Sequence, residues 1–380
     1  MRRLRIAFVV DRFGRQWGGA EAYGVALVRE LSAHHDITVL ARDYDPDCGL
    51  QLPYVALKTR SFWPSWVRVW LHARQVASQT RQGYDIVHSH SNGWAGDIEV
   101  VHVTPVRYRW GVQAMSRLKR IMASISPRVQ TYLGLEARRL APREGHFVVA
   151  VSALIEQQLQ QAYGRPVAQA VIPPGVDMPA ADVDDRIRDR TRQELGLTDT
   201  DQVAILVARN PLRKGLETAM QACLQLPPAF RLLVVGSSAA TRTALESMPD
   251  FHTLADRLIL LPPVTDVSPY YRAADCCIHP TRNDSFGMVP LEAMAHGLPV
   301  VVSTAPWCGF AHYLTNDRDA ILLDRPTDAT ALAQALKRLA SDSSYRQRLV
   351  QGGYEQARRR SWSAIAKQYQ SLYDQVERTR

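Results

Sequence analysis

The sequence predicts an α/β protein of two domains, each a parallel sheet covered by helices on both faces. Short β-branched apolar runs alternate with longer segments of helical periodicity, the pattern of parallel strands joined by crossover helices. The pattern stops at a turn-rich segment, IPPGVDM at 172–178, and then starts again. The chain has 380 residues, more than one hydrophobic core usually supports.

The first domain is predicted to contain strands followed by helices such as AEAYGVALVRELSAHH. Its predicted strands are 4–10, 36–41, 84–90 and 146–152. The predicted strands of the second domain are 202–208, 230–237, 258–264, 275–280 and 299–303. Each run is five to eight residues long and is bounded by polar or glycine-rich turns, as expected of buried strands (about 4–8 residues).

The last segment of the chain is predicted to be an amphipathic helix. Its apolar residues recur at helical spacing, at Trp362, Ile365, Tyr369, Leu372 and Val376. With a linker around Pro173–Gly175, this gives a first domain of residues 1–175 plus the closing helix 361–380. The second domain is then 176–360.

The composition is that of a soluble globular protein, with 46% apolar and 22% charged residues. Apolar runs such as 298–302 are far shorter than the roughly 20 residues of a membrane span, and the N-terminus lacks a small-residue cleavage site. Five cysteines without CxxC spacing favour neither a zinc site nor a disulfide framework. We therefore expect a cytoplasmic protein.

The net charge of +9 is concentrated in two acid-free runs of the first half. The run between Asp47 and Asp85 combines Lys58, Arg60, Arg68, Arg74 and Arg81 with Trp63, Trp66 and Trp70. The run 106–128 combines Arg107, Arg109, Arg117, Lys119, Arg120 and Arg128 with Trp110, Met115, Leu118, Ile121 and Met122. Basic residues mixed with tryptophan and aliphatics suit an anionic membrane surface. The alternative is a solvated basic helix with its apolar face in the core.

Three strand-to-helix turns carry residues that suit an anionic ligand. Gly18 and Gly19 precede a helix, so their N–H groups can approach an anion at its positive end, although a glycine pair can also simply make a turn. Arg209, Arg213 and Lys214 follow the first strand of the second domain, where they can neutralise a diphosphate or, alternatively, be solvated charges at a helix start.

The third turn lies between the strand at 275–280 and a helix whose first turn contains Pro290. The amides of Phe286, Gly287 and Met288 would face a ligand, and Glu292 would lie in the first turn of the helix. As an alternative, Glu292 only stabilises the helix dipole, by about 0.3–1 kcal/mol.

The stretch DSFGMVPLEAMAHGLPVV, from Asp284, resembles the E-x7-E signature of glycosyltransferase family 4. The family's other signs occur in order: GGAE at 18–21, VARNPLRKG at 207–215, VVGS at 234–237 and YYRAADCCIHPTRNDSFG at 270–287. The chain is similar to lipopolysaccharide-core glycosyltransferases of this family. The resemblance implies a GT-B fold, with two Rossmann-like domains facing a central cleft and the last helix crossing back to the first domain. It implies a first domain that binds the acceptor and a second that binds the nucleotide sugar.

The resemblance also assigns roles to residues of the second domain. Arg209 or Arg213, with Lys214, would neutralise the donor diphosphate. Asp284 and the 286–288 amides would hold the transferred sugar, and Glu292 would bind the ribose hydroxyls. The remaining residues of the implied donor site are Ser285 and Val289 in the acidic motif and Pro263, Val264 and Val267 near the nucleobase.

In the first domain the resemblance places Gly18 and Gly19 against the diphosphate and His102 near the sugar. His88 and His90 compete with His102 for that role. The sequence departs from the family at its first acid, which is normally Glu. Because Asp284 is one methylene shorter, its carboxylate reaches about 1.5 Å less far.

Two other functions would each account for part of the sequence. The stretch from Asp43 to Asp47 contains D-x-D, the metal-binding signature of the other glycosyltransferase fold. A single-domain enzyme of that kind would not need a second α/β domain. A nucleic-acid-binding protein would explain the basic charge but would leave the acidic motif without a purpose.

The expected activity is therefore that of a retaining, hexosyltransferase-like enzyme that uses a UDP- or GDP-sugar and needs no metal or other cofactor. Its acceptor would be a glycan or glycolipid of lipopolysaccharide or cell-envelope polysaccharide synthesis, and nucleic acid is not an expected partner. If the basic runs bind lipid, the enzyme would contact the inner face of the cytoplasmic membrane.

Overall fold

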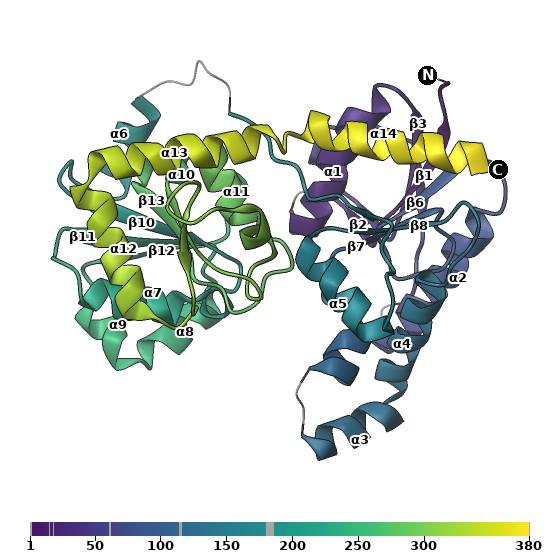
Figure 1. Cartoon of the computed structure of the whole chain (residues 1–380), viewed down its shortest axis with the longest axis horizontal. Coiled ribbons are helices and arrows are strands. Elements are labelled where there is room, and N and C mark those ends of the chain that lie inside the picture. Colours follow the sequence, from purple (N-terminus) through teal and green to yellow (C-terminus); the bar gives the residue numbers. More distant parts are fainter. Residues whose placement is uncertain are drawn as a thin grey trace. The chain divides into compact units, whose positions relative to one another are not determined.

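The computed structural model describes residues 2–14, 16–17, 19–60, 62–113, 116–179 and 186–379. Contacts divide the chain into two compact units (Figure 1). The first unit consists of Met1–Gly175 and Trp362–Arg380, and the second unit of Val176–Ser361. No helix among the described residues is both long and apolar enough to cross a lipid bilayer.

The first unit is built on a seven-stranded parallel sheet of order β5-β3-β1-β6-β7-β8-β9. Its strands are β1 (Arg5–Val9), β3 (Asp36–Ala41), β5 (Tyr54–Ala56), β6 (Ile86–Ser89), β7 (Ile98–Val101), β8 (Phe147–Ala150) and β9 (Ala170–Val171). A short pair, β2 (Arg12–Phe13) and β4 (Asp43–Tyr44), extends β1 and β3. The helices are α1 (Gly19–Ser32), α2 (Ser65–Gln79), α3 (Arg117–Ile125), α4 (Pro127–Arg139), α5 (Ala153–Tyr163) and α14 (Trp362–Thr379), with short turns η1 (Pro46–Cys48) and η2 (Tyr108–Val112).

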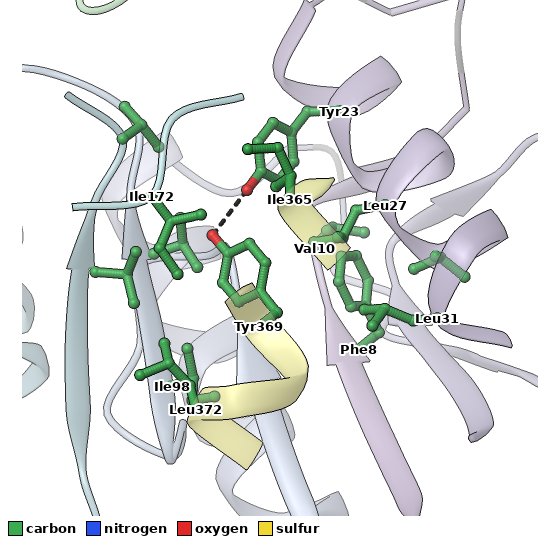
Figure 2. Packing of buried hydrophobic residues seen from close by; sticks show 14 of the residues in the cluster. Phe8, Val10, Tyr23, Leu27, Leu31, Ile98, Ile172, Ile365, Tyr369 and Leu372 are labelled. Carbon is green, nitrogen blue, oxygen red and sulfur yellow. Dashed lines mark hydrogen bonds between the residues drawn. The ribbon is translucent and has the colours of Figure 1, made fainter. Parts of the chain in front are cut away.

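Helix α14, the last of the chain, completes the core of the first unit. Its apolar side chains pack with those of α1 and the central strands (Figure 2). Tyr369 of α14 and Tyr23 of α1 are both fully buried, and their hydroxyls hydrogen-bond at 2.7 Å. Because a buried hydroxyl without a partner costs about 1–3 kcal/mol, this bond lets two tyrosines occupy the core.

The second unit is built on a six-stranded parallel sheet of order β12-β11-β10-β13-β14-β15. Its strands are β10 (Gln202–Val207), β11 (Phe230–Val235), β12 (Leu258–Leu261), β13 (Cys276–His279), β14 (Val300–Ser303) and β15 (Ile321–Leu323). Its helices are α6 (Arg186–Glu194), α7 (Leu216–Leu224), α8 (Ala239–Glu246), α9 (Pro249–Thr253), α10 (Ser268–Ala273), α11 (Met288–Ala295), α12 (Ala329–Ser341) and α13 (Ser343–Arg358), with turns η3 (Leu212–Lys214) and η4 (Gly309–Tyr313).

The predicted fold class is confirmed: each unit is a parallel sheet with helices on both faces. The sequence analysis missed β7, whose pattern is interrupted by an acid. Glu99 is fully buried in that strand, and it is tolerated because Arg139 of α4 donates to it at 3.0 Å. It also missed β5, β9 and β15, which have two or three residues each and lie at or next to sheet edges.

Candidate functional site

The second unit brings together Lys214 and Asp284, which are 70 residues apart in sequence. Strands β10 and β13 are neighbours in the sheet, so the turns at their carboxyl ends lie at the same edge. Lys214 follows β10 in η3, and Asp284 lies in the turn after β13. The Lys214 Nζ donates to the Asp284 Oδ2 at 2.5 Å and to the carbonyl of Asn283 at 3.4 Å. Two residues predicted to act on the donor are therefore directly paired.

His279, the last residue of β13, is the third member of this cluster. Its Nε2 lies 2.9 Å from the same Asp284 oxygen, and its side chain is almost wholly buried. Burial lowers the pKa of His279, so the ring is neutral and donates its N–H. Burial alone would raise the pKa of Asp284, but the His279 hydrogen bond and the Lys214 charge hold it well below its usual range. Asp284 is thus kept ionised.

The turn that carries Asp284 is fixed by backbone contacts. The Asp284 N–H donates to the carbonyl of Trp307 at 2.8 Å, and its carbonyl accepts from Gly309 at 3.0 Å. Gly287 has a φ of 107°, and a Cβ there would lie 2.6 Å from the Sγ of Cys308. Only glycine fits this position, so the Phe-Gly-Met turn has a structural cause as well as a proposed functional one.

The side chain of Phe286 is buried in the core of the second unit and is not exposed to a donor. The side chain is only 4% exposed and packs on Phe310 and Tyr313 in the core of the second unit. Any ligand contact of this residue is therefore made by its backbone. Helix α11 starts directly after Gly287, and the N–H groups of its first turn have no partner within the helix.

The expectation that Glu292 lies in the first turn of the helix is wrong. Helix α11 begins at Met288, so Glu292 is its fifth residue, while Pro290 is in the first turn as predicted. At that distance the helix dipole gives Glu292 little stabilisation. Its Oε2 instead accepts a hydrogen bond from the Tyr271 hydroxyl at 3.0 Å, and burial raises the pKa of Glu292.

The other predicted donor residues of the second unit lie in neighbouring turns. Arg209 and Arg213 are exposed in the β10–α7 turn, where the Asn210 side chain accepts from the Arg213 N–H at 3.3 Å. Gly215 closes this turn with a φ of 91°, and its Cβ would collide with the carbonyl of Pro280. Turns β10–α7 and β13–α11 therefore touch through backbone.

Residues predicted to lie near the nucleobase are in the turn between β12 and α10. Pro263 is exposed, whereas Val264 and Val267 are half-buried against the core of the second unit. Ser285 and Val289 are half-buried in the acidic motif. In the first unit, Gly19 is the first residue of α1, and Gly18 lies outside the described residues.

His102, His90 and His88 of the first unit form a hydrogen-bonded chain rather than competing alternatives. The His102 Nε2 lies 2.6 Å from His90 Nδ1, and the His90 Nε2 lies 3.1 Å from His88 Nε2. The His88 Nδ1 lies 2.7 Å from the hydroxyl of Tyr373 in α14. Burial lowers the pKa of all three rings, to about 3 for His88 and His102, so each is neutral and carries one N–H.

Two distributions of protons satisfy the bonds between the rings, one with Tyr373 as the donor to His88 and one with Tyr373 as the acceptor. The Tyr373 O–H is protonated, because burial raises its pKa, and its partner among the described residues is His88 Nδ1. If Tyr373 donates to the His88 Nδ1, the hydrogen of His88 is on Nε2 and is donated to the His90 Nε2. The hydrogen of His90 is then on Nδ1 and is donated to the His102 Nε2. The hydrogen of His102 is then on Nδ1, the ring nitrogen that does not contact His90.

The D-x-D carboxylates have structural partners within the first unit. Asp43 pairs with Arg12 at 3.2 Å and with Arg42 at 3.1 Å. Asp45 caps η1 by accepting from the Asp47 N–H at 3.1 Å. Within the described part of the chain, no three histidine, cysteine or acidic side chains are grouped as metal ligands would be.

Sequence reasoning missed His279, Tyr271 and Tyr373. His279 had a local signal, because it ends a strand immediately before the acidic motif. Tyr271 and Tyr373 had none, since their partners lie 21 and 285 residues away along the chain.

Comparisons with known proteins cover both units. Residues 17–178 match the family model described as Glycosyltransferase Family 4, and residues 187–356 match the one described as Glycosyl transferases group 1. A D-inositol 3-phosphate glycosyltransferase of Xylanimonas cellulosilytica is 30% identical over 332 residues, covering 81% of this chain and 76% of that protein. One of Salinispora arenicola is 29% identical over 332 residues, covering 80% and 71%.

Solved structures share the fold. WaaG, a glycosyltransferase involved in lipopolysaccharide biosynthesis, has a TM-score of 0.80 at 18% identity, covering 98% of this chain and 99% of that chain. HepE of Anabaena, in complex with UDP and glucose, has a TM-score of 0.76 at 19% identity, covering 98% and 100%.

Proposed function

This chain belongs to the glycosyltransferases of group 1 and family 4, and we propose that it is a retaining enzyme that moves a hexose from a nucleoside-diphosphate donor to an acceptor hydroxyl. The observation that carries the proposal is the cluster of Lys214, Asp284 and His279 beside the start of α11. It combines a cation, a carboxylate held in its ionised form and the N–H groups of a helix start, which have no partner within the helix, at one edge of the sheet.

The cation and the helix start would bind the donor diphosphate. As the sugar leaves, negative charge develops on the diphosphate, and preorganised positive groups stabilise that charge. Lys214 is already fixed at this edge, and the exposed Arg209 and Arg213 in the same turn can approach a phosphate. These charges would do the work that a divalent metal does elsewhere, so the reaction should proceed without one.

Asp284 and Glu292 would bind the hydroxyl groups of the donor. The Asp284 Oδ1 is available to accept from the transferred sugar, because Lys214 and His279 both use Oδ2. Glu292 would accept from the ribose, with Tyr271 holding its other oxygen in place. The similarity of fold to a structure containing UDP and glucose supports a uridine diphosphate donor, with guanosine diphosphate as the alternative.

His102 would donate a hydrogen bond to the transferred sugar rather than remove a proton from it. With Tyr373 as the donor to His88, the chain of rings would leave the N–H of His102 on Nδ1. A neutral donor of this kind stabilises developing charge on oxygen without itself changing charge.

A glycolipid acceptor at an anionic membrane, as in lipopolysaccharide or cell-envelope synthesis, is supported by helix α3. Four of its apolar side chains are 60% to 74% exposed: Leu118, Ile121, Met122 and Ile125. They share a short helix with Lys119, in a stretch of chain without acids. Figure 1 shows α3 away from the sheet of its unit. Exposed apolar residues flanked by basic ones suit the headgroup region of a bilayer.

The experiment that tests the proposed reaction is calorimetric binding of UDP, GDP and ADP, followed by donor hydrolysis in the presence of EDTA. We expect one diphosphate to bind and Lys214→Ala to weaken it roughly 10-fold to 100-fold, since a charged hydrogen bond contributes about 1.5–3 kcal/mol. Lys337→Ala, an exposed lysine of α12, is the matched control. Equal binding by both variants, or loss of hydrolysis in EDTA, would contradict the assignment.

A further inference from the structure

The second unit contains a cavity of about 560 Å³ at the edge of its sheet opposite the cluster of Lys214 and Asp284. Its lining includes Asp275 and Pro299, which directly precede β13 and β14, so it lies at the amino ends of these parallel strands. Ligands of open α/β sheets usually bind at the carboxyl ends. The volume is in the range of small-molecule sites, about 300–1,000 Å³. The cavity is therefore separate from the candidate donor site.

Three arginines from three helices line this cavity: Arg188 of α6, Arg272 of α10 and Arg346 of α13. Among the described residues of the lining, Asp275 supplies the only carboxylate. Arg188 binds that carboxylate at 2.7 Å, and the buried Arg192 approaches it to 3.5 Å. Arg188 also donates to two backbone carbonyls at the end of α10. The charges of Arg188 and Asp275 are therefore used within the protein.

The guanidinium groups of Arg272 and Arg346 are not used in this way. Neither side chain forms a hydrogen bond or an ion pair with another described residue, and both residues are half-buried. Arg346 is the fourth residue of α13, near the positive end of the helix, where the dipole disfavours a cation. Two cations beside one cavity without a counter-ion repel each other, so the arrangement favours an anionic ligand.

The cavity also touches the two side chains that hold Glu292. Tyr271 and His296 both line it, and their rings lie 5.0 Å apart. The Tyr271 hydroxyl donates to the Glu292 Oε2 at 3.0 Å, and the His296 Nδ1 donates to the Glu292 carbonyl at 2.8 Å. An occupant of the cavity therefore contacts both supports of the residue proposed to bind the donor ribose.

We infer that this cavity is an effector site for a compact ligand with a diphosphate group, which Arg272 and Arg346 bind, and that its occupation strengthens donor binding. Guanidinium groups match the oxygens of phosphates, and two of them suit two adjacent phosphoryl groups. A ligand held between α10 and α13 restrains Tyr271 and His296, so less conformational freedom is lost when the ribose binds Glu292. The anion site stands apart from the proposed glycosyl transfer, whereas its effect on the donor rests on it.

The test of the site is a calorimetric titration of the full chain with inorganic pyrophosphate at constant ionic strength, with saturating UDP present to occupy the donor site. Arg272→Met and Arg346→Met, which keep the aliphatic stem, should each weaken pyrophosphate about tenfold or more. Arg348→Met is the matched control, because Arg348 lies on the same helix with its guanidinium over the ring of Tyr345. The site is refuted if the wild type binds no pyrophosphate, or if Arg348→Met weakens it as much as the other two variants do.

The effect on the donor is measured by titrating UDP into the wild type and into Arg272→Met/Arg346→Met at the same pyrophosphate concentration. Competition for the donor site is the same in both proteins, so a difference in UDP affinity isolates the cavity. With pyrophosphate, the wild type should bind UDP about fivefold or more tightly than the double variant. Without it, the two should bind UDP equally, which also shows that the variant is folded.

Equal UDP affinities in the presence of pyrophosphate, or a weaker affinity in the wild type, would overturn the effector role. A wild type that binds no UDP in either buffer would instead refute the proposed function. In that case the loss of pyrophosphate binding in Arg272→Met and Arg346→Met still tests the anion site.

Discussion

At the scale of single residues, the state of Asp284 is set by two neighbours that converge on one oxygen. Lys214 and His279 both donate to its Oδ2, from turns that meet because Gly215 lies directly against Pro280. These two contacts therefore explain why the acid at position 284 is the shorter one, Asp. A longer acid in the same turn would push its carboxylate past both donors.

Asp284→Glu should change the donor preference of the enzyme. The extra methylene moves the carboxylate by about 1.5 Å, so it cannot keep both hydrogen bonds. With the preferred donor of the wild type, kcat/KM should fall roughly tenfold, a loss of about 1.4 kcal/mol of transition-state stabilisation. A panel of nucleotide sugars measures this, with the exposed Asp324→Glu as control. An unchanged preference would mean that the shorter acid carries no specificity.

Tyr373→Phe should lower kcat about tenfold and leave the KM of the donor unchanged. The substitution removes the O–H that fixes the proton positions in His88, His90 and His102. Steady-state kinetics against pH measures the effect. Tyr369→Phe is the matched control, because that tyrosine lies one turn earlier in α14 and bonds Tyr23 instead of a histidine. Equal losses of kcat in both variants would indicate a purely structural role.

Acidification should destabilise the first unit through its buried histidines. Burial lowers the pKa of His88 and His102 to about 3, whereas the unfolded rings titrate near 6.5. Below about pH 6.5 the unfolded state therefore binds more protons, and each ring removes up to about 1.4 kcal/mol of stability per pH unit. Urea unfolding between pH 7 and 4 measures the slope. The slope of unfolding free energy against pH should be shallower in His102→Gln and the same as the wild type in the exposed control His34→Gln.

At the scale of elements, α3 is the helix of the first unit whose apolar side chains are mostly exposed instead of packed. It exposes Ile121 and Ile125, whereas α1, α2, α5 and α14 each contribute apolar side chains to a core. The helix contacts α4, which follows it after Ser126.

The variant Ile121→Glu/Ile125→Glu should abolish flotation with anionic vesicles at low salt. The substitutions remove buried apolar area in the bilayer and add repulsion from the lipid headgroups. Nucleotide binding should be unaffected. Leu224→Glu, at an exposed leucine of the second unit, is the matched control. If the wild type does not float, the proposal of membrane contact is wrong.

At the scale of the whole molecule, the chain leaves the first unit at Gly175 and returns to it at Trp362. These two residues are in direct contact, since a Cβ on Gly175 would lie 2.6 Å from the indole of Trp362. The indole also packs edge-on against Tyr23 at 5.1 Å. Completion of the first core therefore requires α14, whose apolar side chains from Trp362 to Val376 are part of that core.

Trp362→Ala should destabilise the first unit by about 3–5 kcal/mol, the usual cost of truncating a buried aromatic. The unfolding transition of the first unit should move to lower urea, while calorimetric binding of the nucleotide by the second unit is retained. Tyr354→Ala, at an exposed tyrosine of α13, should have little effect on either. Loss of nucleotide binding in Trp362→Ala would show that the units are energetically coupled.

The sequence by itself determined the fold class and the turns that carry the candidate site. Strand and helix periods are local properties of the sequence. So are the glycines of turns that need a positive φ, such as Gly215 and Gly287. The family resemblance rested on these turns, and the matches to both family models confirm it.

Only the tertiary structure decided which side chains are partners. The pairing of Lys214 with Asp284 depends on β10 and β13 being neighbours, and the link from His88 to Tyr373 depends on α14 packing on the first unit. The burial of Phe286 and the helix start at Met288 were likewise set by packing against η4 and Cys308. The order of the strands and the pairing of side chains arise from contacts between residues distant in sequence, and no local pattern encodes them.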